Sequence, residues 1–183
     1  MKSEIDKNVN ITSVVVFGIF FGLLEATVVI YLRQLIGIET SLGTRPITSE
    51  DIAFTLGFIA LLKPSASLVM TQNQAVLSLE LWRELATIVM LACLAFVAGR
   101  NNKEKLLYFF LVFGLWDLFY YIFLRLFIGW PASLWDLDIY FLIPVAWVGP
   151  VITPVIISSI MIVVSFLLLR RSAASLANTP LGK

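Results

Sequence analysis

The chain has 183 residues, of which 60% are hydrophobic and 14% are charged, and its mean hydropathy is +0.95. These values lie outside the range of soluble globular domains and indicate an integral membrane protein. The net charge of +1 leaves no basic surface for nucleic acid. Cys93 is the only cysteine and histidine is absent, which excludes an internal disulfide, a Cys/His zinc site and histidine-ligated haem.

Four segments are long and apolar enough to cross a membrane. A hydrocarbon core of about 30 Å requires about 20 apolar residues in a helix. The segments that meet this requirement span about 13–36, 77–99, 105–129 and 140–169. We therefore predict an all-α membrane protein in which residues 1–183 form a single domain, a bundle of four transmembrane helices.

Two apolar stretches do not fit regular spans. Asp51 to Leu62 is too short to cross the membrane and is stopped by Lys63-Pro64, so we expect a short interfacial or re-entrant helix in the first outer loop. The fourth segment contains Pro144, Pro150 and Pro154. Because proline removes a backbone donor, residues 140–154 are expected to form a broken or re-entrant start to a helix that becomes regular by about Val155.

The distribution of basic residues predicts the orientation. Most Lys and Arg residues outside the spans fall before the first span, between the second and third, and after the fourth, namely Lys2, Lys7, Arg100, Lys103, Lys105, Arg170, Arg171 and Lys183. By the positive-inside rule these regions are cytoplasmic, so both termini face the cytoplasm and loops 38–76 and 130–139 face out. Arg45 and Lys63 are exceptions in the first outer loop.

The first and third spans share a sequence pattern. FGLLEATVVIYLRQLIG at 21–37 and FGLWDLFYYIFLRLFIG at 113–129 match in their glycines and arginine, with Glu25 opposite Asp117. The match predicts two duplicated helical hairpins, about 13–99 and about 105–171, followed by a polar C-terminal tail at 172–183. Hairpins with an even number of spans insert in the same direction, so the repeats would be parallel and related by a pseudo-two-fold axis along the membrane normal.

Charged residues inside the spans are the candidate functional residues. Eight residues of helix rise about 12 Å, which places Glu25 and Asp117 near mid-membrane and Arg33 and Arg125 near the outer surface. Because a charge at mid-membrane costs about 2.5–3.5 kcal/mol on insertion scales, these side chains should face the interior and have partners. We predict one outward-facing cluster, flanked by Trp82, Tyr120, Tyr121 and Tyr140 and made of Glu25, Arg33, Glu80, Arg83, Glu84, Asp117, Arg125 and Asp138.

Two interpretations of this cluster remain open. In the first, the acids and arginines neutralise one another across the bundle and fix the helix register. In the second, Glu25 and Asp117 face each other and share a proton or hold a hard divalent cation such as Mg²⁺, Ca²⁺ or Mn²⁺, with Glu84 as a further ligand. The sequence identifies no cofactor and no catalytic residue, and we expect neither haem nor zinc.

Several stretches resemble a family of bacterial multi-pass membrane proteins that has no assigned activity. They read LEATVVIYLR, LELWRELATIVML, FGLWDLFYYIFLRLFIGWPASL and DIYFLIPVAWVGPVITPV, and the resemblance extends over most of the chain. The family usually has proline where this chain has Ala146. The resemblance implies a location in the bacterial inner (cytoplasmic) membrane and carries over no catalytic residue.

Three classes of function are compatible with these features. The first is a non-catalytic accessory or structural subunit of a larger membrane complex, since the chain is small and has no cofactor motif. The second is a protein that binds or translocates a proton, a cation or a small anion. The third is a small membrane enzyme that uses the carboxylates with or without a divalent metal. We expect the lipid bilayer and other membrane subunits or further copies of the chain as partners, and no nucleic acid.

Overall fold

A computed structural model describes residues 11–36, 47–66 and 74–177. Within these ranges the protein is mostly helical, and four helices are each long and apolar enough to cross a membrane. They are α1 (Ile11–Ile36), α3 (Gln74–Ala98), α4 (Asn102–Ile128) and α5 (Ile152–Ala177). The prediction of four helices long and apolar enough to span a membrane is confirmed.

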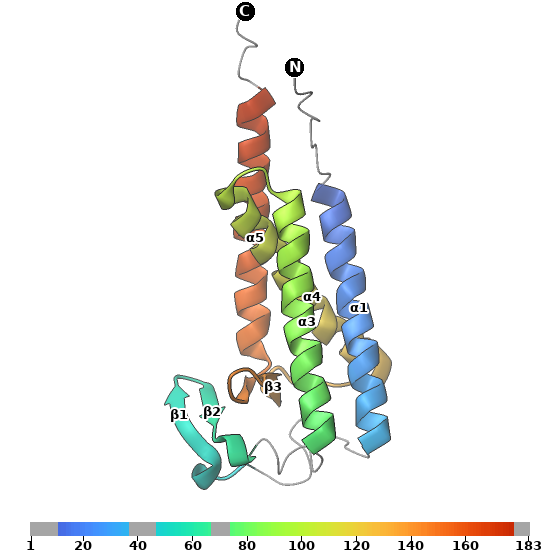
Figure 1. The fold of residues 1–183 in the computed structure, drawn as a ribbon, viewed down its shortest axis with the longest axis vertical. Coiled ribbons are helices and arrows are strands. Elements are labelled where there is room, and N and C mark those ends of the chain that lie inside the picture. Colours follow the sequence, from blue (N-terminus) through green and yellow to red (C-terminus); the bar gives the residue numbers. More distant parts are fainter. Residues whose placement is uncertain (1–10, 37–46, 67–73, 178–183) are drawn as a thin grey trace, which may run out of the picture.

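The helices alternate in direction (Figure 1). Helices α1 and α4 run one way, and α3 and α5 run the other way, so that α1 begins and α5 ends at the same end of the bundle. We call this the terminal end. The opposite end carries all of the β-strands and is called the sheet end. The parallel direction of α1 and α4 is what the duplication requires, but the internal repeat itself stays a prediction.

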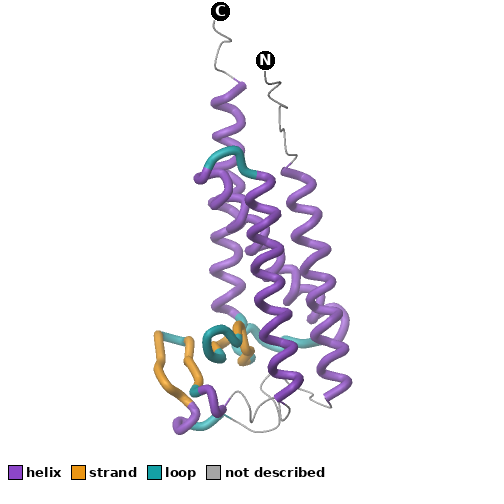
Figure 2. Tube along the Cα trace, viewed as in Figure 1, coloured by secondary structure: helices purple, strands orange, loops and turns teal. Residues whose placement is uncertain are grey.

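A small antiparallel sheet closes the sheet end (Figure 2). After the short 3-10 helix η1 (Ser49–Asp51), its strands are β1 (Ile52–Leu56), β2 (Ile59–Leu62), β3 (Leu137–Phe141) and β4 (Trp147–Pro150), in the spatial order β1-β2-β4-β3. Strand β2 pairs with β4 through Ala60 opposite Val148 and Leu61 opposite Trp147. The connections between α1 and α3 and between α4 and α5 are therefore joined in one sheet.

The expected interfacial helix over Asp51 to Leu62 is wrong, because the structure has a β-hairpin there. Strands β1 and β2 meet at the two-residue turn Gly57-Phe58, where Gly57 has a φ of +59°. A positive φ suits glycine and the tight turns of hairpins. The helix prediction rested on hydropathy and length alone, whereas β-branched and aromatic residues such as Ile52, Phe54 and Ile59 also favour strands.

The fourth helix is regular by Val155 as predicted, but the residues before it form strands and not the broken or re-entrant helix that we expected. Residues 140–150 belong mainly to the hairpin of β3 and β4, and α5 begins only at Ile152. Pro144 lies between the two strands and Pro150 ends β4. Pro154 lies in the first turn of α5, where the missing N–H costs little because that position needs no helical donor. The helix then continues to Ala177, so residues 172–177 of the expected polar tail are helical.

Helix α4 is the centre of the bundle and packs against α1, α3 and α5. Gly22 on α1 permits the close approach of α4, because a Cβ atom there would lie 2.7 Å from the carbonyl oxygen of Trp116. Gly114 plays the same part toward α5, where a Cβ would lie 2.8 Å from the carbonyl oxygen of Ser158. Small residues at such crossings allow van der Waals contact between backbones, which drives helix association in lipid.

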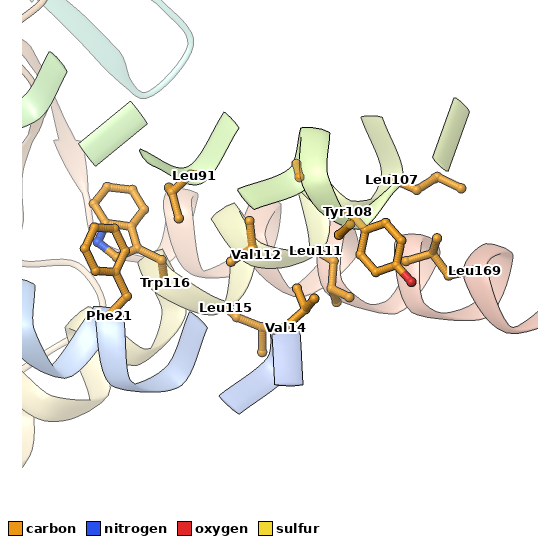
Figure 3. Packing of buried hydrophobic residues seen from close by; sticks show 12 residues of the cluster. Val14, Phe21, Leu91, Leu107, Tyr108, Leu111, Val112, Leu115, Trp116 and Leu169 are labelled. Atoms are coloured by element: carbon orange, nitrogen blue, oxygen red, sulfur yellow. The ribbon is translucent and has the colours of Figure 1, made fainter. Parts of the chain in front are cut away.

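The apolar core lies toward the terminal end of the bundle (Figure 3). Its buried side chains come from the beginning of α1, the end of α3, the first half of α4 and the end of α5, and include Val14, Leu91, Leu111, Val112 and Leu169. Phe21 and Trp116 mark its limit toward the sheet end. A second group of polar side chains lies beyond this limit, between the apolar core and the sheet.

Candidate functional site

A polar cavity of about 60 Å³ lies between the helices and the sheet. Side chains of α1, α3, α4 and β3 line it. Its carboxylates are Glu25, Glu84, Asp117 and Asp138, and Arg83 is the single cation among its lining residues. We call this space the acidic cavity. It brings together four of the predicted acids and one of the predicted arginines.

Arg83 on α3 binds two carboxylates. Its Nη1 contacts Oε1 of Glu25 on α1, and its Nη2 lies 2.7 Å from Oε2 of Glu80, one turn away on its own helix. The Nε of Arg83 also donates to both oxygens of Glu80 at 3.2 Å. This arrangement follows the first interpretation of the cluster, since a mid-membrane acid on one helix is neutralised by an arginine on another.

Glu84 links α3 to the connection between α4 and α5. Its Oε2 accepts a hydrogen bond from the backbone N–H of Leu142 at 2.8 Å, and its Oε1 accepts one from Ile143 at 3.3 Å. Both donors lie at the end of β3 or directly after it. One carboxylate therefore satisfies two backbone donors that the strand pairing leaves over and holds the β3–β4 hairpin on the bundle.

Asp117 and Asp138 each accept a hydrogen bond from a hydroxyl group. The Oγ of Ser158 on α5 donates to Oδ2 of Asp117 at 2.7 Å, and the hydroxyl of Tyr121 on α4 donates to Oδ2 of Asp138 at 2.8 Å. Asp138 is 2% exposed. Among the described residues, no hydrogen bond joins Glu25 to Asp117, although both side chains line the same cavity. The structure therefore does not show the direct contact between Glu25 and Asp117 that the second interpretation expected.

Tyr140 lines the acidic cavity on the side that faces the sheet. Its hydroxyl donates to the carbonyl oxygen of Pro150 at 2.6 Å, which ties β3 to the end of β4. Burial raises the pKa of Tyr140 to about 12, so the hydroxyl stays protonated at neutral pH. Glycine at position 149 leaves room beside it, because a Cβ there would lie 2.5 Å from the tyrosine oxygen and 2.7 Å from the backbone oxygen of Phe58.

The other predicted arginines lie outside the cavity. The guanidinium of Arg33 stacks over the ring of Trp130 at 4.4 Å from the centroid. Arg125 is exposed and donates to the carbonyl oxygens of Gly129 and, at 2.9 Å, Pro131, which closes the end of α4. Trp82, expected to flank the cluster, is 68% exposed and is not among the residues that line the cavity.

The described residues contain no group of three His, Cys, Asp or Glu side chains placed to hold a metal ion. Glu25, Glu84 and Asp117 line one cavity, but each carboxylate faces its own donor. A divalent ion bound in an all-protein cage needs several oxygen ligands at 2.0–2.6 Å. The arrangement therefore gives no support to the three acids as a divalent site.

Three polar residues in or beside the cavity were not identified from the sequence. Ser158, which binds Asp117 from α5, adjoins Ser159 in an apolar stretch of that helix, and this polar pair was a usable signal. Thr87 and Trp116 line the cavity and are 5% and 7% exposed. Neither could be found from its residue type, because threonine and tryptophan are ordinary residues of membrane helices.

A second buried acid, also not identified from the sequence, lies at the terminal end. Glu104 is 4% exposed, pairs with Arg100 at 3.0 Å and accepts a hydrogen bond from Ser172 of α5 at 3.0 Å. Asn101 caps α4 by accepting a hydrogen bond from the N–H of Glu104 at 2.9 Å. This pair holds the turn between α3 and α4 against α5 and has no contact with the acidic cavity.

The acidic cavity thus combines several carboxylates with an apolar boundary on one side. Among the described residues, four carboxylates and Arg83 line it, and Glu80 shares Arg83 with Glu25. The apolar core separates the cavity from the terminal end.

No protein-family model, curated protein or solved structure matches this chain.

Proposed function

We propose that this chain is a non-catalytic accessory or structural subunit of a larger membrane complex, and that its acidic cluster holds an outer sheet on the helix bundle. The observation that carries the proposal is the direction of the polar contacts. Glu84 binds the backbone after β3, and Asp138 on β3 binds Tyr121 of α4. Buried acids that join a sheet to a bundle serve assembly of the structure and need no substrate.

The sheet offers a surface on which a partner subunit could bind. Strand β1 is an edge strand, and the side chains of Phe54, Leu56 and Phe58 around its turn are 58%, 66% and 75% exposed. An exposed apolar edge strand has unpaired backbone donors and acceptors and is a template for pairing with another chain. This hairpin therefore supports an assembly role more than a catalytic one.

The proposed orientation places the sheet outside the bacterial inner membrane and the terminal end in the cytoplasm. It rests on the basic residues near the terminal end, such as Arg100, Lys103 and Arg170. A partner that binds the sheet would then be another membrane subunit with an external part, or a second copy of this chain.

The test is purification of the native chain in mild detergent, with the mass of the complex measured by native mass spectrometry. We expect a complex heavier than the chain alone, and we expect Leu56→Lys with Phe58→Lys to release the partner. Trp135→Lys is the matched control, because Trp135 is 67% exposed but lies outside the strands. A monomeric wild-type chain, or a complex that both variants retain equally, would reject the role of the hairpin.

The carboxylates that line the cavity favour a second candidate, a protein that binds a proton or a cation. Like-charge repulsion disfavours a small anion as the ligand. The apolar core between Phe21, Leu91 and Leu111 closes the route to the terminal end, so this candidate is a site open toward the sheet end and not a continuous path.

A further inference from the structure

We propose that a groove between α4 and α5, at the sheet end of the bundle, binds one anionic phospholipid of the surrounding bilayer, with the lipid phosphate at Arg125 and an acyl chain along Leu118 and Ile122. We call this space the lipid groove. The proposal goes beyond the accessory role and is independent of it, because no residue of the β1–β2 hairpin lines the groove.

The lipid groove exists because α4 and α5 diverge toward the sheet end. Near the terminal end, Ser172 of α5 binds Glu104 in the first turn of α4. At the sheet end, the chain directly after α4 lies beside α1, where the guanidinium of Arg33 stacks over Trp130. Helix α4 therefore moves away from α5 as it runs toward the sheet end, and a groove of about 390 Å³ remains between them.

The connection after α4 closes the groove at the sheet end. The N–H of Ile152, the first residue of α5, donates to the carbonyl oxygen of Leu134 at 2.8 Å. The Nη1 of Arg125 on α4 donates to the carbonyl oxygen of Pro131 at 2.9 Å. These two bonds attach the connection to both helices, so the groove is pre-formed, as ligand sites usually are.

Apolar and charged side chains are ordered along the groove. Leu118, Ile122 and Val155 line the part nearer the middle of the bundle, and Arg125 lies in the last turn of α4. Seven residues of helix rise about 10 Å, which places Arg125 that much closer to the membrane surface than Leu118. A phospholipid has the same order of groups, with its chains toward the membrane centre and its phosphate at the surface. Ile122 is 44% exposed, so this wall of the groove is open to lipid.

Arg125 supplies the charge that selects an anionic headgroup. It is the only charged side chain among the described residues that line the groove. Its Nη1 donates to the carbonyl oxygens of Gly129 and Pro131, which hold the guanidinium in place without neutralising it. None of the ion pairs within the described part of the chain includes Arg125. Its Nε and Nη2 remain as donors, and arginine binds phosphate through two such N–H groups in parallel.

Two acids near the groove are occupied by other donors. The Oδ2 of Asp136 accepts hydrogen bonds from the N–H groups of Ala132 and Ser133 at 2.7 and 3.1 Å. Asp138 accepts a hydrogen bond from the hydroxyl of Tyr121, whose side chain lines both the groove and the acidic cavity. Asp136 and Asp138 do not line the groove, so the charge that a ligand meets there is positive.

The apolar walls favour a lipid over a soluble anion. A free phosphate would gain the contact with Arg125 but would lose water against Leu118, Ile122 and Val155, which is costly for a charged group. An acyl chain loses nothing by lying against the same side chains. The groove volume falls within the range of about 300–1,000 Å³ that is typical of small-molecule sites, so it can hold part of one lipid.

The experiment adds lipids to the purified full-length protein in mild detergent and measures the bound molecules by native mass spectrometry. The probes are phosphatidylglycerol, which is anionic, and phosphatidylcholine, which is zwitterionic, with identical acyl chains. For the first bound molecule we expect a preference for phosphatidylglycerol of about fivefold, the effect of one basic residue near an anionic membrane surface. An excess of inorganic phosphate should not displace the bound lipid.

Two variants change the two parts of the groove separately. Arg125→Gln removes the charge while its amide can still donate to a carbonyl oxygen, so the preference for phosphatidylglycerol should disappear. Ile122→Trp fills the apolar part and leaves Arg125 in place, so binding of the first molecule of either lipid should be lost. Lys63→Gln and Leu126→Trp are the matched controls, because Lys63 is a basic residue at the same end and Leu126 is 71% exposed on α4, and neither lines the groove. Both controls should bind lipid as the wild type does.

Equal binding of the two lipids by the wild type would overturn the proposal. A preference that persists in Arg125→Gln, or a first lipid that Ile122→Trp retains at the wild-type level, would also overturn it, because the lipid would then bind elsewhere. Displacement by inorganic phosphate would instead indicate a site for a soluble anion. A lipid adds far less mass than a protein subunit, so none of these outcomes bears on the accessory role, which is tested separately.

Discussion

At the scale of residues, the acids in the membrane helices are explained by their partners. Glu25 is neutralised by Arg83 of the neighbouring helix, and Glu84 is satisfied by two backbone N–H groups. Buried ion pairs stabilise a protein little when compared with apolar replacements, but breaking one is costly because the remaining charge is stranded. Removing Arg83 is therefore expected to destabilise the protein more than removing one of its two carboxylate partners.

Replacing Arg83 should destabilise the protein more than replacing Glu25. Arg83→Met leaves Glu25 and Glu80 without a cation, and we expect a loss of about 3–5 kcal/mol in the free energy of unfolding. Glu25→Gln leaves Arg83 paired with Glu80, so its loss should be smaller, about 1–2 kcal/mol. Denaturant titration in detergent measures both. Equal losses in the two variants would show that Glu80 does not hold Arg83 by itself.

Replacing Glu84 should loosen the β3–β4 hairpin. The amide of Glu84→Gln has one acceptor oxygen where the carboxylate has two, so one of the N–H groups of Leu142 and Ile143 loses its acceptor. We expect a loss of about 1–3 kcal/mol and faster hydrogen exchange at residues 142–143. Glu104→Gln is the matched control, since Glu104 lies at the other end of the bundle. Unchanged exchange in the Glu84 variant would contradict this role.

At the scale of elements, the sheet is the feature that organises the connections between α1 and α3 and between α4 and α5. Hydropathy assigned 51–62 to a short helix and 140–154 to a broken or re-entrant start of a helix, yet both segments contain strands, and β2 pairs with β4. Each hairpin alone would be marginal, because an isolated two-stranded hairpin has little stability in water. Pairing of β2 with β4 makes a four-stranded unit and links the two halves of the chain.

A disulfide should form across this pairing. Ala60 and Val148 are opposite residues of β2 and β4, and facing residues of antiparallel strands lie within reach of a disulfide. In a Cys93→Ser background, we expect Ala60→Cys with Val148→Cys to be oxidised readily, seen as a mobility shift that a reductant reverses. Thr55→Cys with Val148→Cys is the control, because Thr55 pairs with Ala60 on the far side of β2. Similar oxidation of both pairs would contradict the strand order.

At the scale of the whole molecule, polarity is divided along the bundle. Apolar side chains fill the terminal end, and the polar groups of the cavity lie under the sheet. The cavity therefore lies nearer the sheet end, and the orientation of the bundle in the membrane decides which compartment that end faces.

Cysteine labelling should reveal that orientation. In a Cys93→Ser background, Ser133→Cys and Ser49→Cys lie at the sheet end, and both native residues are exposed. We expect a membrane-impermeant thiol reagent to label them in intact cells. Asn102→Cys at the terminal end should be labelled only after the membrane is opened. The reverse pattern would place the sheet in the cytoplasm. Ser41 in the predicted loop 38–76 would be an equivalent labelling position, but it lies outside the described residues.

The sequence by itself determined the membrane class, the number of spans and most of the polar residues that meet in the cavity. Hydrophobic length is a local property that is read along the chain, and the cost of burying charge requires acids such as Glu25 to find partners. The equivalent positions of Arg33 and Arg125 in the sequence pattern did not predict which groups these arginines contact. Helix ends offer carbonyl and aromatic partners, and only the tertiary arrangement placed these arginines there.

Only the tertiary structure decided between helix and strand in the outer connections. A short apolar segment such as 52–62 satisfies either state locally, and pairing with Trp147 and Val148, more than 80 positions away (148 against 60), selects the strand. The same holds for Glu84 and Ser158, whose partners come from distant elements. Local periodicity does not encode long-range pairing. The groups that donate hydrogen bonds to the carboxylates of the cavity could therefore be identified only from the fold.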